Sequence, residues 1–195
     1  MTPTVTGLRE RKRSRVAVEL DGRPWRVLPT DAVVRAGLVV GRQLDRHTAR
    51  ELAREIRRGR ALAQATRTLA TSARSRGDLE QRLARAGHGG AAREEALESL
   101  DRAGLVDDAR LAETRAAVLA RRGYGDAAIR ADLRRRLIGV EAATDAVAGL
   151  EPELARVGRV IAGRDATPKL LRRLAARGFS RDTLDEVASS FAPEG

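Results

Sequence analysis

A short helical unit recurs along the 195-residue chain and constrains its fold more than any other feature. The clearest copies are Leu79-x-x-x-Leu83-x-x-x-Gly87-His88, Ile129-x-x-x-Leu133 and Leu170-x-x-x-Leu174-x-x-x-Gly178-Phe179. A spacing of four places both apolar side chains on one helix face, and a glycine one turn later supplies the left-handed residue that ends the helix. The copies start at residues 79, 129 and 170, so they lie 50 and then 41 residues apart. Periods of this size predict tandem helical modules, which generally bind partners rather than catalyse reactions.

Composition excludes several classes of protein. Aromatic residues make up 2% of the chain, so a core must be built from alanine, leucine and valine. There is no cysteine, which excludes disulfides and thiolate chemistry and gives no sign of secretion. No amino-terminal signal sequence and no apolar run of about 18 residues is evident. We therefore expect a cytoplasmic protein that does not interact with membranes.

The net charge of +11 is unevenly distributed. Residues 1–60 contain 15 basic and 7 acidic residues, a balance of +8, whereas 61–150 and 151–195 carry +2 and +1. A basic end favours a polyanion or an acidic protein surface as partner. Almost all of the cations are arginines in an alanine-rich chain, however, a pattern that GC-rich coding also produces.

Residues 4–29 are predicted to form strands. Val16, Val18 and Leu20 alternate with other residues, and Asp21-Gly22 follows, which is a strong signal for a hairpin because both central residues of a type I′ turn need positive φ. Pro29-Thr30-Asp31 is expected to cap a short helix over residues 32–36 that stops at Gly37.

The rest of the chain is predicted to be helical. The expected helices span about 45–70, 77–86, 91–103, 107–122, 127–137, 141–148, 152–163, 168–178 and 180–191. We group them into a basic amino-terminal segment (1–59) with the β-hairpin and short helices, followed by three-helix modules over 60–106, 107–150 and 151–195. The fold class is mainly α, an elongated array of such modules. Thr167 is expected to cap the helix that starts at Pro168, where proline sacrifices no hydrogen bond.

The order of the motifs is similar to that of one known family. The segments that carry the similarity are Arg74-Ser75-Arg76-Gly77-Asp78-Leu79, Leu100-Asp101-Arg102-Ala103-Gly104-Leu105-Val106-Asp107-Asp108, Arg121-Arg122-Gly123-Tyr124-Gly125 and Lys169-Leu170-Leu171-Arg172-Arg173-Leu174. Over nearly the whole chain, from about Val5 to about Phe191, the sequence resembles the RecX family of recombination regulators.

The resemblance implies helix-turn-helix-like modules and a cytosolic protein that binds the RecA recombinase or the RecA–DNA filament. It also implies that the protein restrains RecA, lowering its strand exchange, ATP hydrolysis and co-protease activity. One departure from the family pattern concerns the second module. There glycine arrives two residues late, at Gly139, so that corner is expected to have a different shape.

The second module is predicted to be the best binding surface for a protein or nucleic-acid partner. Arg134 to Arg136 are consecutive on one helix, so at least one of them should face a ligand. The candidates are Arg115, Arg121, Arg122, Tyr124, Arg130, Arg134, Arg135 and Arg136. Tyr124, between two glycines, is the aromatic residue best placed to be exposed, whereas Phe179 and Phe191 are expected in the core. Arginines whose stems only cover alanine remain the alternative for any individual residue.

Two further basic clusters are candidates. The first, Arg9, Arg11, Lys12, Arg13 and Arg15, could guide the protein to phosphates or to an acidic face of RecA, or could simply protect an edge strand. The second consists of Arg172, Arg173 and Arg177, for which internal salt bridges to Asp182, Asp185 and Glu186 are the favoured role.

No catalytic or metal-binding pattern is evident, so we expect neither an enzyme nor a cofactor. The leading hypothesis is a regulator that engages RecA through several weak module contacts. Direct binding of single- or double-stranded DNA is the main alternative, and a scaffold for other helices is a third. The chain has no asparagine and three glutamines, which argues against rich readout of base sequence.

Overall fold

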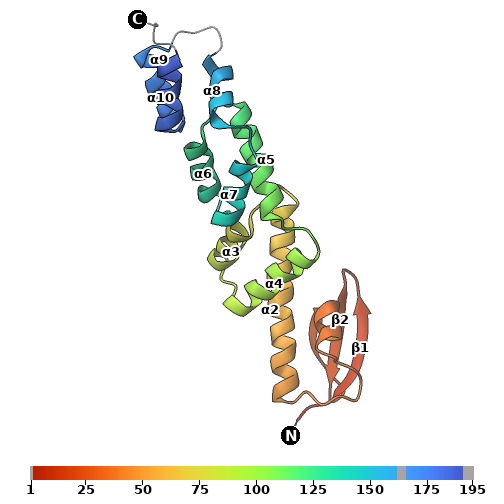
Figure 1. Ribbon diagram of the computed structural model, residues 1–195. Coiled ribbons are helices and arrows are strands. Elements are labelled where there is room, and N and C mark those ends of the chain that lie inside the picture. Colours follow the sequence, from red (N-terminus) through yellow and green to blue (C-terminus); the bar gives the residue numbers. More distant parts are fainter. Residues whose placement is uncertain (1, 162–165, 191–195) are drawn as a thin grey trace, which may run out of the picture. The chain divides into compact units, whose positions relative to one another are not determined.

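The computed structural model describes residues 2–161 and 166–190, and it is mainly α-helical with one three-stranded sheet (Figure 1). The chain forms two compact units. The first comprises Met1–Thr71 and Glu80–Leu105, and the second comprises Ser72–Leu79 and Val106–Gly195. Helix α3 (Arg76–Arg85) contributes its first turn to the second unit and its later turns to the first.

The amino-terminal sheet is antiparallel, with strand order β1-β2-β3. Its strands are β1 (Val5–Arg11), β2 (Arg15–Leu20) and β3 (Arg23–Pro29). The Asp-Gly hairpin is confirmed, since Asp21 (φ 50°) and Gly22 (φ 77°) both adopt left-handed conformations between β2 and β3.

The sequence prediction was incomplete for the other half of this sheet, because it specified one hairpin. A second turn joins β1 to β2, and there Arg13 (φ 63°) and Ser14 (φ 53°) are left-handed. Neither residue type is typical of such a turn, so the local sequence carries no signal for it. The pairing of Arg11 with Arg15 closes the turn.

One face of the sheet packs against two helices of the first unit, α1 (Thr30–Arg35) and α2 (Arg46–Leu69). Alternate residues of β2 point inward, so Val16 and Val18 are buried with Leu52 of α2. The expected α1 cap is wrong, because Pro29 occupies the N-cap position and no side chain caps the helix. At α2 the Asp45 carboxylate accepts a hydrogen bond from the Thr48 N–H at 2.7 Å.

Helix α4 (Gly90–Arg102) completes the first unit by packing along α2. Buried alanines and leucines of α4 face α2, and polar contacts lie at the edge of this interface. The Arg58 guanidinium of α2 donates to the Ser99 hydroxyl at 3.0 Å, and Arg54 donates to Glu95 at 2.6 Å.

The second unit is helical throughout its described part. Beyond the first turn of α3, its helices are α5 (Asp108–Arg121), α6 (Asp126–Arg135), α7 (Val140–Ala148), α8 (Glu153–Ile161), α9 (Pro168–Ala176) and α10 (Arg181–Ser190). Ile129 and Leu133 are fully buried with alanines of α5 and α7, whereas Leu174 and Phe179 lie in a second core with Val157. The predicted core position of Phe179 is confirmed, and that of Phe191 lies outside the described residues.

The predicted helix ends agree with the structure at most described positions. Thr167 caps α9 by accepting from the Leu170 N–H at 3.3 Å, with Pro168 in the first turn. The predicted end of α8 at Gly163 lies outside the described residues. The three-module division also remains a prediction, since the two compact units follow a different boundary. Within the described parts of the chain, no helix is both long and apolar enough to span a bilayer.

The recurring glycine corner has one hydrogen-bonding pattern wherever it occurs. After α9, Gly178 is left-handed at φ 84°, and its N–H donates to the Ala175 carbonyl at 2.9 Å. The next N–H, from Phe179, donates to the Leu174 carbonyl at 3.3 Å. This pair of bonds is a Schellman motif, which satisfies carbonyl groups that the helix leaves open.

The expectation that the corner of the second module, after α6, has a different shape is wrong. Leu137 occupies the glycine position and is left-handed at φ 57°. Its N–H and that of Ile138 donate to Arg134 at 2.9 Å and to Leu133 at 3.2 Å, so the Schellman motif is preserved without glycine. Leucine is unusual in this conformation, and the surrounding packing must hold it there.

Candidate functional site

The amino-terminal basic cluster lies on β1 and on the turn that joins it to β2. Arg11, Lys12, Arg13 and Arg15 are exposed there, and Arg11 pairs directly with Arg15 across the strands. Arg9 lies 3.5 Å from the Glu19 carboxylate, but most of its side chain is in solvent. The cluster is therefore an exposed cationic turn beside an edge strand, an arrangement consistent with both of its predicted roles.

In the second unit one carboxylate holds three of the candidate arginines. Arg115 of α5 binds Asp132 of α6 through two hydrogen bonds of 2.8 and 3.2 Å. Arg135 and Arg136 reach the same carboxylate at 3.3 and 3.0 Å. Hydrogen bonding from Arg115, assisted by Arg136, holds the pKa of Asp132 well below its usual range. These arginines are thus part of the α5–α6 packing, although Arg135 remains largely exposed.

The other candidate arginines of the second module make weaker contacts with carboxylates, or none among the described residues. Arg130 makes a loose ion pair with Asp126 at 3.7 Å. Arg121, Arg122 and Arg134 are exposed, and none of them pairs with a carboxylate in the described part of the chain. Arg121 and Arg122 lie at the carboxyl-terminal end of α5, where the helix dipole favours cations.

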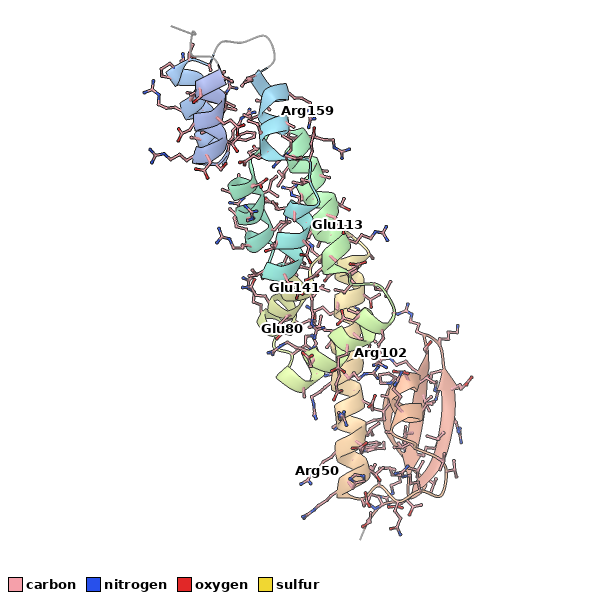
Figure 2. The ribbon with its side chains drawn as sticks, viewed as in Figure 1. Arg50, Glu80, Arg102, Glu113, Glu141 and Arg159 are labelled. Carbon is pink, nitrogen blue, oxygen red and sulfur yellow. The ribbon has the colours of Figure 1, made fainter. Side chains whose placement is uncertain are left out.

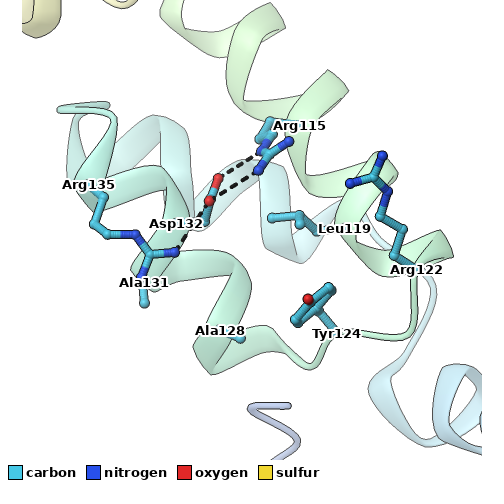
Figure 3. A pocket seen from close by; sticks show the side chains of 8 residues that line it. All are labelled: Arg115, Leu119, Arg122, Tyr124, Ala128, Ala131, Asp132 and Arg135. Carbon is cyan, nitrogen blue, oxygen red and sulfur yellow. Dashed lines mark hydrogen bonds and ion pairs between the residues drawn. The ribbon is translucent and has the colours of Figure 1, made fainter.

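Tyr124 faces a hollow of about 400 Å³ between α5 and α6, here called the tyrosine hollow (Figure 3). Its lining residues are Arg115, Leu119, Arg122, Tyr124, Ala128, Ala131, Asp132 and Arg135. Tyr124 is 39% exposed, which confirms the expectation that this residue is accessible. The hollow combines an aromatic ring and small apolar side chains with a polar wall made by the Arg115–Asp132 pair.

A second hollow, of about 480 Å³, lies beside the same corner and is here called the arginine hollow. Its basic lining residues are Arg121, Arg122, Arg156, Arg159 and Arg177. Arg122 lines both hollows, so the two adjoin at this side chain. Three of these five arginines are candidates predicted from the sequence, whereas Arg156 and Arg159 are not.

The basic cluster of α9 does not form the predicted internal salt bridges. Among the described residues, Asp185 pairs instead with Arg181 of its own helix, at 3.6 Å. Arg172 and Arg173 are exposed on α9. Arg177 lies at the corner after α9, where its guanidinium is 6.0 Å from the centre of the Tyr124 ring. The spacing of four residues predicted that Arg173 and Arg177 share one helix face. Because α9 ends at Ala176, Arg177 lies in the following turn instead and faces Tyr124 at the α5–α6 corner.

Arg156 of α8 is a buried cation of the second unit that the sequence did not single out. Its side chain is 3% exposed, and it donates to the carbonyls of Glu151 at 2.9 Å and Tyr124 at 3.1 Å. It also pairs with the Asp126 carboxylate. The sequence contained one signal for this burial, because Arg156 directly precedes Val157 on the buried side of α8. An arginine that is buried there must find polar partners. Arg159, also missed, pairs with Glu151.

Hydrogen bonds between helix ends recur at two junctions of the second unit. At the start of α3, the Ser75 hydroxyl donates to the Arg136 carbonyl at 2.5 Å. The Arg76 N–H donates to the Asp108 carboxylate at 2.8 Å. Asp108 is the first residue of α5, and Arg136 directly precedes the left-handed corner residue.

The start of α6 repeats this arrangement with other side chains. The Gly125 N–H donates to the Arg177 carbonyl at 2.9 Å, and the Asp126 N–H donates to Glu153 at 2.7 Å. Glu153 is the first residue of α8, and Arg177 again precedes a left-handed corner. The equivalent contacts indicate that the second unit is built from one repeated connection between consecutive copies.

No group of residues in the described ranges could hold a metal ion. The ring of His88 is 2.9 Å from the side-chain oxygen of Gln64, so it has a structural partner. The site is therefore a set of basic, partly apolar hollows.

No family model matches the chain. It is 32% identical over 137 residues to "Regulatory protein RecX" of Mycobacterium leprae (strain Br4923), covering 62% of this chain and 79% of the relative. Its fold matches "Crystal structure of regulatory protein RecX" with a TM-score of 0.79 and 19% identity, over 96% of this chain and 99% of the other. RecX from Lactobacillus salivarius matches with a TM-score of 0.60 and 19% identity, over 69% and 96%. At this identity the structural matches show a shared fold.

Proposed function

This chain belongs to the RecX family of regulatory proteins, and from that premise we propose that it binds the RecA recombinase, alone or as a filament on DNA, and inhibits it. The activities expected to fall are strand exchange, ATP hydrolysis and co-protease activity. Membership of the family supports RecA as the partner.

The proposed mode of binding is inferred from the repeated junctions at the starts of α3 and α6. Equivalent hydrogen bonds join the start of α3 to α5 and to the corner after α6, and the start of α6 to α8 and to the corner after α9. Similar helical surfaces are therefore presented in tandem. A filament is itself a repeating surface, so each repeat can meet an equivalent site. Linked weak contacts bind tightly together because each raises the effective concentration of the next.

The exposed cations determine how the protein approaches its partner. Arg121, Arg122 and Arg134 in the second repeat, and Arg172 and Arg173 on α9, have no carboxylate partner in the described part of the chain. Together with the basic turn of the sheet they attract DNA phosphates or acidic patches on RecA.

The test is RecA ATP hydrolysis on single-stranded DNA with this protein titrated in. We expect loss of activity well below one protein per RecA, because capping or disassembling a filament affects many subunits. Activity that stays constant up to stoichiometric amounts would contradict the proposal.

Direct DNA binding is the second candidate, and the exposed turn around Arg13 favours it. It predicts binding to naked duplex that falls steeply with salt, together with unchanged RecA hydrolysis. A titration of duplex DNA at two salt concentrations separates this candidate from the first.

A further inference from the structure

The arginine hollow and the tyrosine hollow adjoin at Arg122, and we propose that together they bind a nucleotide. The phosphoryl group occupies the arginine hollow and the base occupies the tyrosine hollow. Both spaces have volumes within the range of about 300–1,000 Å³ that is usual for small-ligand sites. The ligand is either a free nucleotide or one unit of a single strand.

The arginine hollow carries uncompensated positive charge. Arg156 is paired with Asp126, and Arg159 with Glu151. The other three arginines, Arg121, Arg122 and Arg177, have no carboxylate partner in the described part of the chain. Three guanidinium groups around one hollow repel one another, and a multiply charged anion between them removes that repulsion. The planar fork of arginine matches phosphate oxygens particularly well.

Backbone geometry keeps this hollow open. Gly123 is left-handed at φ 77°, and a Cβ built there would lie 3.0 Å from Val160 and 3.2 Å from the Arg177 guanidinium. A side chain there would make tight contacts with Val160 and Arg177, which would have to shift slightly to relieve them. Glycine thus suits both the left-handed turn and the crowded edge of the hollow.

The tyrosine hollow has the mixture of apolar and polar lining that a base requires. Leu119, Ala128 and Ala131 form apolar walls next to the exposed Tyr124 ring (Figure 3). The carboxylate of Asp132 is already bound by arginines, so it does not leave a free negative charge that would repel the ligand. Bases stack on such rings with little dependence on their identity.

The proposal concerns this chain alone and does not require RecA. Binding of nucleotides can therefore fail while inhibition of RecA holds, and the reverse is also possible. The control variant comes from α2, where Arg57→Gln/Arg60→Gln removes two exposed arginines that line neither hollow.

The experiment is isothermal titration calorimetry of the full chain at low ionic strength with pyrophosphate, ADP and a thymidine oligonucleotide. Arg121→Gln/Arg122→Gln should weaken all three by about 10-fold or more, because charged hydrogen bonds are lost. The matched double variant Arg57→Gln/Arg60→Gln should retain wild-type affinity for pyrophosphate and ADP.

The tyrosine hollow is tested by Tyr124→Ala and Tyr124→Phe. The alanine variant should bind ADP and the oligonucleotide about 5-fold more weakly or worse, yet keep its affinity for pyrophosphate, which also shows that it is folded. Phenylalanine should restore stacking. Tight binding of ADP identifies a free nucleotide as the ligand, whereas binding of the oligonucleotide without ADP identifies a single strand.

Two outcomes would overturn the proposal. In the first, wild type binds none of the three probes. In the second, Arg121→Gln/Arg122→Gln and the α2 control lose the same affinity, which would mean that net charge rather than the hollow attracts the anion.

Discussion

Consecutive arginines of α6 differ in role because one carboxylate reaches only some of them. Arg135 and Arg136 bind Asp132, whereas Arg134 is exposed and has no carboxylate partner among the described residues. The direction in which a side chain leaves the helix decides this, since neighbouring residues point about 100° apart. Counting arginines therefore overestimates the charge available to a partner.

Leu137 provides a prediction at the scale of one residue. Its left-handed backbone disfavours any residue with a Cβ by about 1 kcal/mol, which glycine avoids. Leu137→Gly and Leu137→Ala both lose the leucine contacts, but only the alanine variant keeps the strain. We expect the glycine variant to be the more stable by about 1 kcal/mol in urea denaturation. Equal stabilities, or the reverse order, would contradict the strain at this corner.

Consecutive copies of the repeated element in the second unit meet through contacts between helix ends. The corner after α6 lies so close to α3 that a Cβ on Gly77 would be 2.6 Å from the Leu137 carbonyl oxygen. At the next junction, a Cβ on Gly125 would be 2.3 Å from the backbone of Gly178. Glycine at these positions permits the close approach of two backbones.

Two glycines within helices test this packing as a matched pair. Gly59 lies within α2 with no atom near the site of a Cβ, so Gly59→Ala should stabilise the protein by about 0.5–1 kcal/mol. Gly77→Ala gains less helix propensity because Gly77 is the second residue of α3, and its Cβ must displace Leu137, so it should be destabilising. Thermal unfolding of both variants measures the difference. A stabilising Gly77→Ala would show that the junction is not tightly packed.

Glu153 provides a prediction at the scale of the α6–α8–α10 connection. Its carboxylate accepts from the backbone of Asp126 at 2.7 Å and of Ser180 at 3.0 Å, and from the Thr183 hydroxyl at 3.0 Å. Glu153→Gln has one acceptor oxygen and cannot satisfy both backbone groups. We expect a loss of about 1–3 kcal/mol, measured by urea denaturation. Glu113→Gln on the exposed face of α5 is the control and should change little.

The same carboxylate predicts a dependence on pH. Burial raises the pKa of Glu153, but hydrogen bonds from Ser180, Asp126 and Thr183 outweigh it and leave the pKa below its ordinary value of 4.5. The stabilisation is therefore fully present above pH 4.5 and is lost as pH falls through the lower folded-state pKa. The stability difference between wild type and Glu153→Gln should shrink below pH 4.5. A constant difference would exclude ionisation as its source.

For the whole molecule, the tandem arrangement predicts that inhibition depends on the number of repeats. Removal of residues 151–195 leaves a chain without α8, α9 and α10, and we expect it to need at least about 10-fold more protein to inhibit RecA ATP hydrolysis. Far-ultraviolet circular dichroism and cooperative unfolding verify that the shortened chain is folded. Undiminished inhibition by a folded, shortened chain would contradict multivalent binding.

The sequence alone determined which segments are helices and where most of them end. Apolar residues spaced by four, the Thr167 cap and the Asp21-Gly22 turn are local signals, and the structure agrees with them. The family resemblance also followed from the order of such signals along the chain, and the relative from Mycobacterium leprae bears it out.

Tertiary structure alone decided which charged residues are available and how the corners are held. Asp132 meets Arg115 across 17 positions, and Arg156 meets Asp126 across 30 (Figure 2 shows how densely such side chains cover the helices). No local spacing encodes these pairs. Leu137 likewise adopts a glycine conformation only because the packing of α3 and α6 outweighs its local preference. Local propensities therefore specify the elements, whereas contacts between distant residues decide what each side chain can bind.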